Sequence, residues 1–243
     1  MRKIHGFTLA EILITLGIIG IVAAMTIPSL ITNYRRKQLE IRFKQADSLV
    51  TQAMKSTLYE LEYDKQSDMD LDASSSVIEE RRREYNDIWE KQFKGVTKLQ
   101  ACKIINKPVK NFYLENDGYR NYCWSFGGND SYALLLSNGS LVSEIQVSKE
   151  TVYLNRAVFF VSIDTNGPYN GPNAYGYDIF FITPEDFERV TAGLLCDPFR
   201  TSTANLHGCY WYAHKNTSAF KGLNYWDTLY RSKEYLQKLK DEA

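Results

Sequence analysis

A single carboxylate, that of Glu11, lies inside a long apolar segment. Residues 7–31 read FTLAEILITLGIIGIVAAMTIPSLI, and Glu11 is the one charged residue among them. A bilayer span needs about 20 predominantly apolar residues, so this segment is long enough to cross a membrane. A carboxylate within such a helix costs up to about 3 kcal/mol or more, and such residues are usually functional. If Glu11 becomes buried among apolar helices, it needs a positive partner.

Short polar sequences flank this segment, MRKIHG before it and NYRRKQ after it. An ordinary signal peptide has an apolar region of about 7–15 residues followed by a small-residue cleavage site. The present segment is longer, and no A-x-A stands at its end. A plain signal anchor is the other simple interpretation, but the basic residues on the two sides oppose each other and do not orient it. Glu11 fits neither interpretation.

The sequence around Gly6 closely resembles the cleavage and methylation signal of type IV prepilins. In that family a short basic leader ends in glycine, phenylalanine follows, and glutamate is the fifth mature residue. Gly6-Phe7-Thr8-Leu9-Ala10-Glu11 matches each of these positions, and Pro28 follows at a spacing similar to the family's. The resemblance covers roughly the first 35 residues.

The resemblance implies how the chain is processed and assembled. A prepilin peptidase would cut between Gly6 and Phe7, and the new amine of Phe7 would be methylated. In a filament, the amine of Phe7 on a neighbouring subunit is the expected partner of Glu11. That pairing would set the axial register, as one buried polar group can do in a coiled coil.

Two helix-weakening residues lie in the second half of the apolar segment. Pro28 removes a backbone donor and clashes with the preceding turn, and Gly20 has low helix propensity. By resemblance to the family, the stretch from Gly20 to Pro28 would melt when subunits leave the membrane. A kinked membrane helix is the equally weighted alternative.

The helical pattern continues beyond the membrane segment. Apolar residues recur at steps of three and four and form one face of an amphipathic helix: Leu39, Phe43, Ala46, Val50, Ala53, Thr57 and Leu61. We expect helix from Phe7 to Glu62. The predicted organisation is a leader (1–6), a transmembrane and assembly segment (7–31), an amphipathic half-helix (32–64) and a globular head (65–243).

The head is predicted to combine helices with antiparallel strands. Ser76-Val77-Ile78-Glu79 has the pattern of a capping box, from which a second helix would run to Lys94 and end at Gly95. Strands are expected at residues 132–136, 141–147, 158–163 and 177–183, with a short helix at 225–239. Asn138-Gly139 predicts a hairpin with a type I′ turn. The expected fold class is α+β, with the long N-terminal helix packed on an antiparallel sheet as in pilins.

Four cysteines lie in the predicted head, and no Cys-x-x-Cys occurs, which argues against a zinc ribbon or a redox motif. Outside the cytoplasm four cysteines usually form two disulfides. Three pairings are possible, and we prefer sequence neighbours, Cys102 with Cys123 and Cys196 with Cys209. His207 and His214 near Cys209 are interpreted as structural, because no four-ligand zinc spacing appears.

A loop rich in Gly, Pro and Asn follows the strand at 158–163. Asp164, Asn166, Asn173 and Asp178 could present hard oxygen ligands, so calcium is a possible cofactor, although the loop lacks the spacing and the final glutamate of an EF-hand. The alternative is that these Asx side chains close turns on their own backbone. No other cofactor is expected.

The composition and the motifs argue against several classes of protein. Lys plus Arg equals Asp plus Glu at 29 each, which argues against a nucleic-acid partner, and a mean hydropathy of −0.36 excludes a polytopic membrane protein. No catalytic motif is present, so an enzyme is not expected. The resemblance implies a pilin or pseudopilin, favoured as a type II secretion pseudopilin. The alternatives are a type IV pilus subunit for adhesion or DNA uptake and a membrane-anchored binding domain.

The resemblance also implies partners and location. The partners would be the prepilin peptidase and methylase, other subunits through the N-terminal helix, and an inner-membrane assembly platform. Before assembly the chain would cross the inner membrane once, with the head in the periplasm or outside the cell. After assembly it would lie in a filament.

Overall fold

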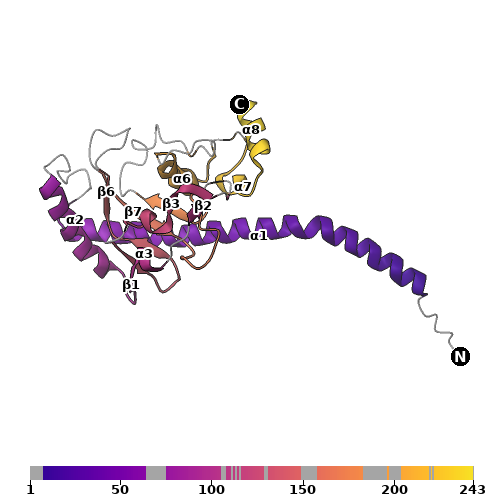
Figure 1. The fold of residues 1–243 in the computed structure, drawn as a ribbon, viewed down its shortest axis with the longest axis horizontal. Helices are drawn as coiled ribbons and strands as arrows, with labels where there is room; N and C mark the ends of the chain where they lie inside the picture. Colours follow the sequence, from indigo (N-terminus) through magenta and orange to yellow (C-terminus); the bar gives the residue numbers. More distant parts are fainter. Residues whose placement is uncertain are drawn as a thin grey trace. The chain divides into compact units, whose positions relative to one another are not determined.

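A computed structural model describes residues 8–63, 75–104, 108–110, 112, 114, 116–128, 131–148, 158–182, 196, 204–218, 220 and 222–242. The chain divides into two units, residues 1–38 and residues 39–243. Figure 1 labels the elements.

Helix α1 (Leu9–Glu60) contributes to both units. In the second unit its buried face follows the predicted apolar stripe. This face consists of Leu39, Phe43, Ala46, Val50, Ala53, Met54, Thr57 and Leu58. Because these positions recur every three or four residues, they share one side of the helix, and that side forms part of the head core.

Helix α2 (Ser75–Trp89) and the 3-10 turn η2 (Glu90–Gln92) follow. The predicted capping box is wrong in register, because Ser76 lies inside the helix rather than before it. Two aromatic side chains fix α2 to the head through polar tips. The Tyr85 hydroxyl donates to the carbonyl of Met54 (3.4 Å), and Trp89 Nε1 donates to the carbonyl of Ser143 (3.2 Å).

The main sheet is antiparallel and has six strands in the part of the chain that the structure describes. They are β1 (Thr97–Gln100), β4 (Tyr132–Leu135), β5 (Leu141–Ser143), β6 (Gln146–Ser148), β7 (Val158–Asp164) and β8 (Ile179–Ile182). Strand β7 pairs with β5, β6 and β8. The predicted single strand at 141–147 is interrupted at Glu144 and Ile145, so β5 and β6 pair with successive parts of β7. Helix plus antiparallel sheet confirms the predicted α+β class.

The hairpin predicted at Asn138-Gly139 joins β4 and β5, but its turn is not type I′. Gly139 has a φ of +87°, whereas Asn138 is not among the residues with positive φ. The N–H of Gly139 donates to the carbonyl of Leu136, and the N–H of Leu136 donates to the carbonyl of Ser140. This is a three-residue loop with a left-handed glycine at its end, which is the next commonest hairpin solution.

The two faces of the sheet bury different clusters, because side chains alternate along a strand. One face packs on α1 and carries Leu134, Val142, Val161, Ile163, Phe180 and Ile182. The other carries Ala133, Leu141, Ile179 and Phe181, which pack with Tyr122, Cys123 and Phe126. The surrounding elements are α3 (Ala101–Ile104), β2 (Pro108–Lys110), β3 (Asn116–Asn121) and α4 (Tyr122–Ser125).

The described residues of the head contain three further helices, which are α6 (Ala204–Lys215), α7 (Tyr225–Thr228) and α8 (Lys233–Asp241). Helix α6 lies beside β8. The tail helix predicted at 225–239 is divided in two, because Tyr230 adopts a φ of +60°. Ser232 then caps α8 by accepting a hydrogen bond from the N–H of Tyr235.

Candidate functional site

The first turn of α1 is closed by Thr8 and Glu11. The backbone N–H of Thr8 donates to Glu11 Oε2 (2.7 Å), and the Thr8 hydroxyl donates to the same oxygen (2.8 Å). The N–H of Glu11 lies 3.3 Å from Thr8 Oγ1. This reciprocal arrangement is a capping box. Thr8 was not predicted as a capping residue, although Thr-x-x-Glu before an apolar run is the sequence pattern of a capping box.

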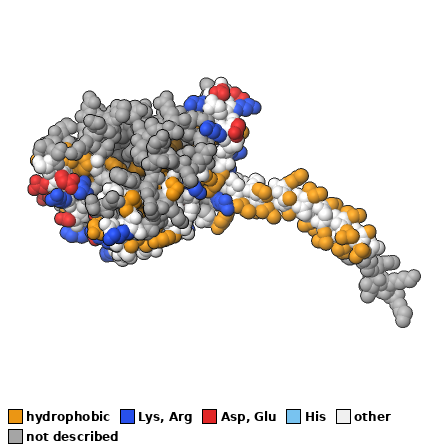
Figure 2. Space-filling model, in the orientation of Figure 1, with side chains coloured by type: hydrophobic (Ala, Val, Ile, Leu, Met, Phe, Trp, Pro, Cys, Tyr) orange, Lys and Arg blue, Asp and Glu red, His pale blue; other side chains and the backbone are white. Residues whose placement is uncertain are grey.

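The rest of this helical half is apolar and exposed in the isolated chain. Large apolar side chains from Leu9 (80% exposed) to Ile31 (45% exposed) are exposed, and Figure 2 shows hydrophobic side chains distributed along this part of α1. By length and composition this is the one described helix that could cross a membrane, with a mean hydropathy of 2.2 in its most apolar window. Glu11 is the only acidic group on this surface.

Of the other residues predicted to be functional in this segment, some are described by the structure and some are not. Gly6 and Phe7 lie outside the described residues. Gly20 and Pro28 lie inside α1, which is helical on both sides of each. A Cβ added at Gly20 would meet no atom within 4 Å. The prediction that this stretch melts on leaving the membrane stays a prediction.

A second polar site lies in the head, in the loop between β7 and β8. Asp164 ends β7 and is fully buried. Its Oδ1 accepts the backbone N–H groups of Asn166 (3.0 Å) and Gly167 (2.8 Å). Its Oδ2 accepts the hydroxyl of Tyr122 (2.7 Å). Asp164 therefore closes the first turn of the loop and fastens it to α4.

Asp178 does the same for the second half of the loop. It is also fully buried, and its two oxygens accept the N–H groups of Asn173 (2.8 Å) and Ala174 (2.7 Å). Two aspartates 14 positions apart in sequence are thus brought close enough together to interact electrostatically. The predicted alternative, Asx side chains closing turns on their own backbone, describes these contacts well.

Burial perturbs both carboxyl groups. Desolvation raises the pKa of Asp164 to about 6, against the opposing effect of its hydrogen bonds. Desolvation, and after it the charge of Asp164, raise the pKa of Asp178 well above its ordinary value. Two carboxylates enclosed in one small loop repel each other when both are ionised. One of them therefore tends to hold a proton near neutral pH.

We expect this pair to make the head more stable at mildly acidic pH. Because the folded state holds the protons more tightly, the stabilisation is complete below about pH 4 and is lost as pH rises through about 6 and beyond. Asp164 alone would contribute on the order of 3 kcal/mol to this change. Urea unfolding of the full chain in detergent at pH 5 and pH 7.5 measures it.

The matched variants are Asp178→Asn and Asp87→Asn. The first removes one member of the pair and should reduce the difference between the two pH values without abolishing it, because burial still raises the pKa of Asp164. The second removes an exposed aspartate from α2 and should leave that difference unchanged. An identical pH dependence in wild type and Asp178→Asn would refute the assignment.

The amide oxygens of Asn166 and Asn173 are possible ligands of the predicted calcium ion. Both Oδ1 atoms are buried and accept no hydrogen bond from the described residues. Calcium takes six to eight oxygen ligands, so these two oxygens and the carboxylates of Asp164 and Asp178 fit such an ion chemically. The described residues contain no group of three or more His, Cys, Asp or Glu side chains that could hold a metal. Calcium stays a prediction.

Calcium binding has a distinct expected result. An ion between the carboxylates would favour their ionised forms, so 5 mM Ca²⁺ should raise the thermal midpoint at pH 7.5 and should do so much less at pH 5. The Asp178→Asn variant should lose the effect. If EGTA and Ca²⁺ give the same midpoint at pH 7.5, the aspartates act only as turn anchors.

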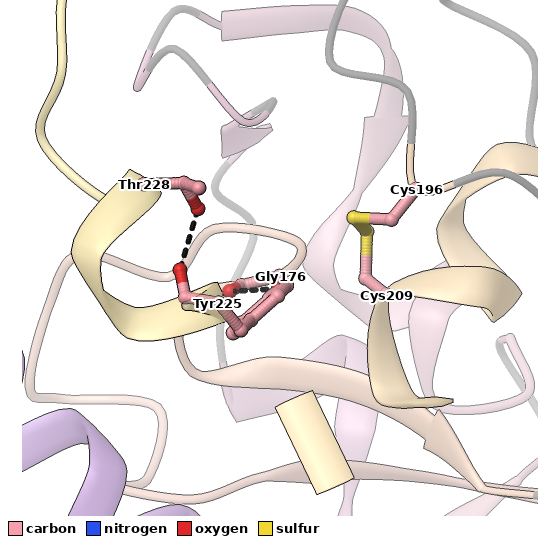
Figure 3. The surroundings of a disulfide bond; sticks show 5 residues. All are labelled: Gly176, Cys196, Cys209, Tyr225 and Thr228. Atoms are coloured by element: carbon pink, nitrogen blue, oxygen red, sulfur yellow. Dashed lines mark hydrogen bonds between the residues drawn. A yellow bond between two sulfur atoms is a disulfide. The ribbon is translucent and has the colours of Figure 1, made fainter. Parts of the chain in front are cut away.

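Two disulfides fasten the elements around this loop. Cys102 of α3 is bonded to Cys123 of α4, and Cys196 is bonded to Cys209 of α6, which is the pairing of sequence neighbours. Figure 3 shows the second bond together with the contact that ties the loop to α7. There the Tyr225 hydroxyl donates to the carbonyl of Gly176 (2.6 Å).

The side chain of His214 contacts helix α1. His214 Nδ1 lies 2.8 Å from Asp47 Oδ2, and the hydroxyl of Tyr210 donates to the other oxygen of Asp47. These contacts join α6 to α1 and agree with a structural interpretation of His214. The side chain of His207 lies outside the described residues.

Comparison with known proteins adds one finding. Residues 1–27 match the model of the prokaryotic N-terminal methylation motif, which is the prepilin signal of type IV pilins and pseudopilins. No curated protein and no solved structure matches the chain. The matched residues include the first turn of α1, with Glu11, and much of its exposed apolar surface.

Proposed function

We propose, from the methylation motif at residues 1–27, that the chain is a subunit of a type II secretion pseudopilus. The motif supports the broader class, a type IV pilin-like or pseudopilin subunit with a structural role. Cleavage between Gly6 and Phe7 by the prepilin peptidase and methylation of Phe7 follow from that class. Other subunits and an inner-membrane assembly platform are the proposed partners.

One structural observation supports the broader class of pilin-like subunits. Glu11 is the sole acidic group on an exposed apolar helix surface. The same helix continues into the core of the head, which contains two disulfide bonds. A subunit built this way can bury its apolar surface against identical helices, which gains about 25 cal/mol per Å². The head is then left on the outside of the filament.

The Glu11 carboxylate would have different partners before and after filament assembly. Before assembly, Thr8 supplies hydrogen bonds to the carboxylate, while the chain spans the membrane with its N-terminus at the cytoplasmic face. On assembly the amine of Phe7 from a neighbouring subunit pairs with the same carboxylate. An amine that carries a positive charge adds Coulomb attraction to the carboxylate, which the uncharged donor groups of Thr8 do not supply.

The experiment that tests the subtype is deletion of the chain in its own organism. A secretion pseudopilin predicts that exoprotein secretion is lost, while surface pili, adhesion and DNA uptake persist. Loss of adhesion or DNA uptake with normal secretion would instead identify a type IV pilus subunit. If the chain is absent from every filament and all these activities persist, a membrane-anchored binding domain is the better description.

A further inference from the structure

Three asparagines of the head are followed directly by glycine: Asn138, Asn166 and Asn170. An asparagine in this position can react with its own backbone. The nitrogen of the glycine attacks the side-chain carbonyl carbon of the asparagine, and an imide ring closes as ammonia leaves. Glycine favours this reaction because it has no side chain to obstruct the approach and its backbone is conformationally permissive. Asparagine is accordingly one of the thermolabile residue types.

The backbone N–H of the glycine decides whether the ring can close. Its nitrogen must lose its proton and come within bonding reach of the side-chain carbon, in the geometry that an intramolecular attack requires. An N–H that donates a hydrogen bond within the fold is held in another direction, and breaking that bond leaves its acceptor without a partner. A glycine whose N–H has no acceptor in the fold does not carry this cost.

Asn138 is exposed in the hairpin between β4 and β5, but the turn holds both reacting groups. The N–H of Gly139 donates to the carbonyl of Leu136 (2.9 Å). The side-chain oxygen of Asn138 accepts the N–H of Ser140 (3.0 Å). Ring closure at Asn138 would therefore break a hydrogen bond of the turn.

Asn166 is held more firmly, in the loop between β7 and β8. It is 5% exposed, and the N–H of Gly167 donates to Oδ1 of the buried Asp164 (2.8 Å). Nδ2 of Asn166 donates to the carbonyl of Gly171 (3.0 Å). Ring closure at Asn166 would take a donor away from a buried carboxyl oxygen, which is costly.

Asn170 lies in the same loop and lacks this protection. Both Asn170 and Gly171 are exposed, and the N–H of Gly171 has no hydrogen-bond acceptor among the residues that the structure describes. A Cβ added at Gly171 would meet no atom within 4 Å, so the space around this residue is open. Nδ2 of Asn170 donates to the carbonyl of Asn166 (2.8 Å), but that bond does not involve the attacking nitrogen.

We propose that Asn170 is a site of spontaneous deamidation. The nitrogen of Gly171 bonds to Cγ of Asn170, the bond from Cγ to Nδ2 breaks, and the proton of the glycine N–H passes through solvent to the departing ammonia. Water then opens the imide ring and leaves aspartate or isoaspartate at this position.

The modification changes the loop in two ways. It removes the hydrogen bond from Nδ2 of Asn170 to the carbonyl of Asn166. It also adds a negative charge to the loop that the buried carboxyl groups of Asp164 and Asp178 close. We therefore expect the loop to loosen as the protein ages. The inference depends neither on the type of filament nor on processing of the N-terminus.

The test compares the three asparagines within one sample of the full chain. The chain is incubated in detergent at pH 8 and 37 °C in water enriched in oxygen-18, and peptide fragmentation in a mass spectrometer follows each asparagine. Ring opening places one oxygen of water in the product, so only deamidation during the incubation is labelled. We expect Asn170 to react at least about fivefold faster than Asn138 or Asn166, because a hydrogen bond must break at the other two. In urea the three rates should be similar.

The variant Gly171→Ala makes the test specific. It keeps Asn170 but places a methyl group beside the attacking nitrogen, so the rate at Asn170 should fall severalfold while the rate at Asn138 stays the same. The added methyl group meets no atom within 4 Å, so the head should stay folded. Equal rates at the three asparagines of the folded wild-type chain overturn the proposal, whether or not the variant folds. A folded Gly171→Ala chain with an unchanged rate at Asn170 also overturns it.

Discussion

Replacing Glu11 with glutamine is expected to remove the chain from filaments while it accumulates in the membrane. Glutamine keeps a side-chain oxygen that can accept the N–H of Thr8, so the first turn of α1 should remain capped. What it loses is the charge that pairs with the amine of a neighbouring Phe7. Breaking one partner of a buried pair leaves the other uncompensated, so assembly should fall on the order of a hundredfold or more.

The measurement is the amount of the chain in sheared filaments relative to the membrane fraction. Thr8→Val is the informative companion, because it removes the hydroxyl that donates to Glu11 (2.8 Å) but leaves the carboxylate. It should assemble far better than Glu11→Gln. Glu60→Gln removes a carboxylate from the other end of α1 and should assemble like wild type. Equal assembly of Glu11→Gln and wild type would contradict the proposed role of the charge.

Replacing Phe43 with alanine is expected to destabilise the head by about 3–5 kcal/mol. Phe43 is 1% exposed, and its ring lies 4.7 Å from that of Phe180, 5.3 Å from Trp226 and 5.7 Å from Tyr210. One α1 side chain thus fills a space between β8, α6 and α7. Because surrounding rings cannot collapse freely into the vacated volume, the loss includes a cavity as well as the transfer term.

Urea unfolding of the full chain in detergent, followed by tryptophan fluorescence, measures this loss, because Trp89 and Trp226 are both buried in the core. Ile41→Ala is the matched control on the same helix, since Ile41 is 40% exposed. It should cost less than about 1 kcal/mol. Similar midpoints for Phe43→Ala and Ile41→Ala would mean that α1 does not form the core of the head.

The long helix and its buried face could be predicted because their signals are local. Apolar residues at helical spacing mark the stripe that contains Leu39, Phe43 and Ala46, and burial of this stripe confirms it. The antiparallel hairpin at Asn138-Gly139 could also be predicted from the sequence. Its turn type was not, because the same two residues suit both a two-residue and a three-residue loop. The choice depends on the register of β4 against β5.

The polar contacts of the head depend on pairings that a single sequence does not reveal. Tyr122 reaches Asp164 across 42 positions, and Tyr210 reaches Asp47 across 163. The four loop residues named as possible ligands do come together, but their backbone contacts follow from the tight turns of the loop. The interruption of α7 and α8 at Tyr230 was also missed, because no glycine marks it.

The most direct test of the central claim is the intact mass and N-terminal sequence of the chain from its native membrane, with and without active prepilin peptidase. The account predicts a chain that starts at methylated Phe7 when the peptidase is present and at Met1 when it is absent. A chain that still starts at Met1 beside an active peptidase would contradict the pilin-like assignment, and Glu11 would then need another explanation.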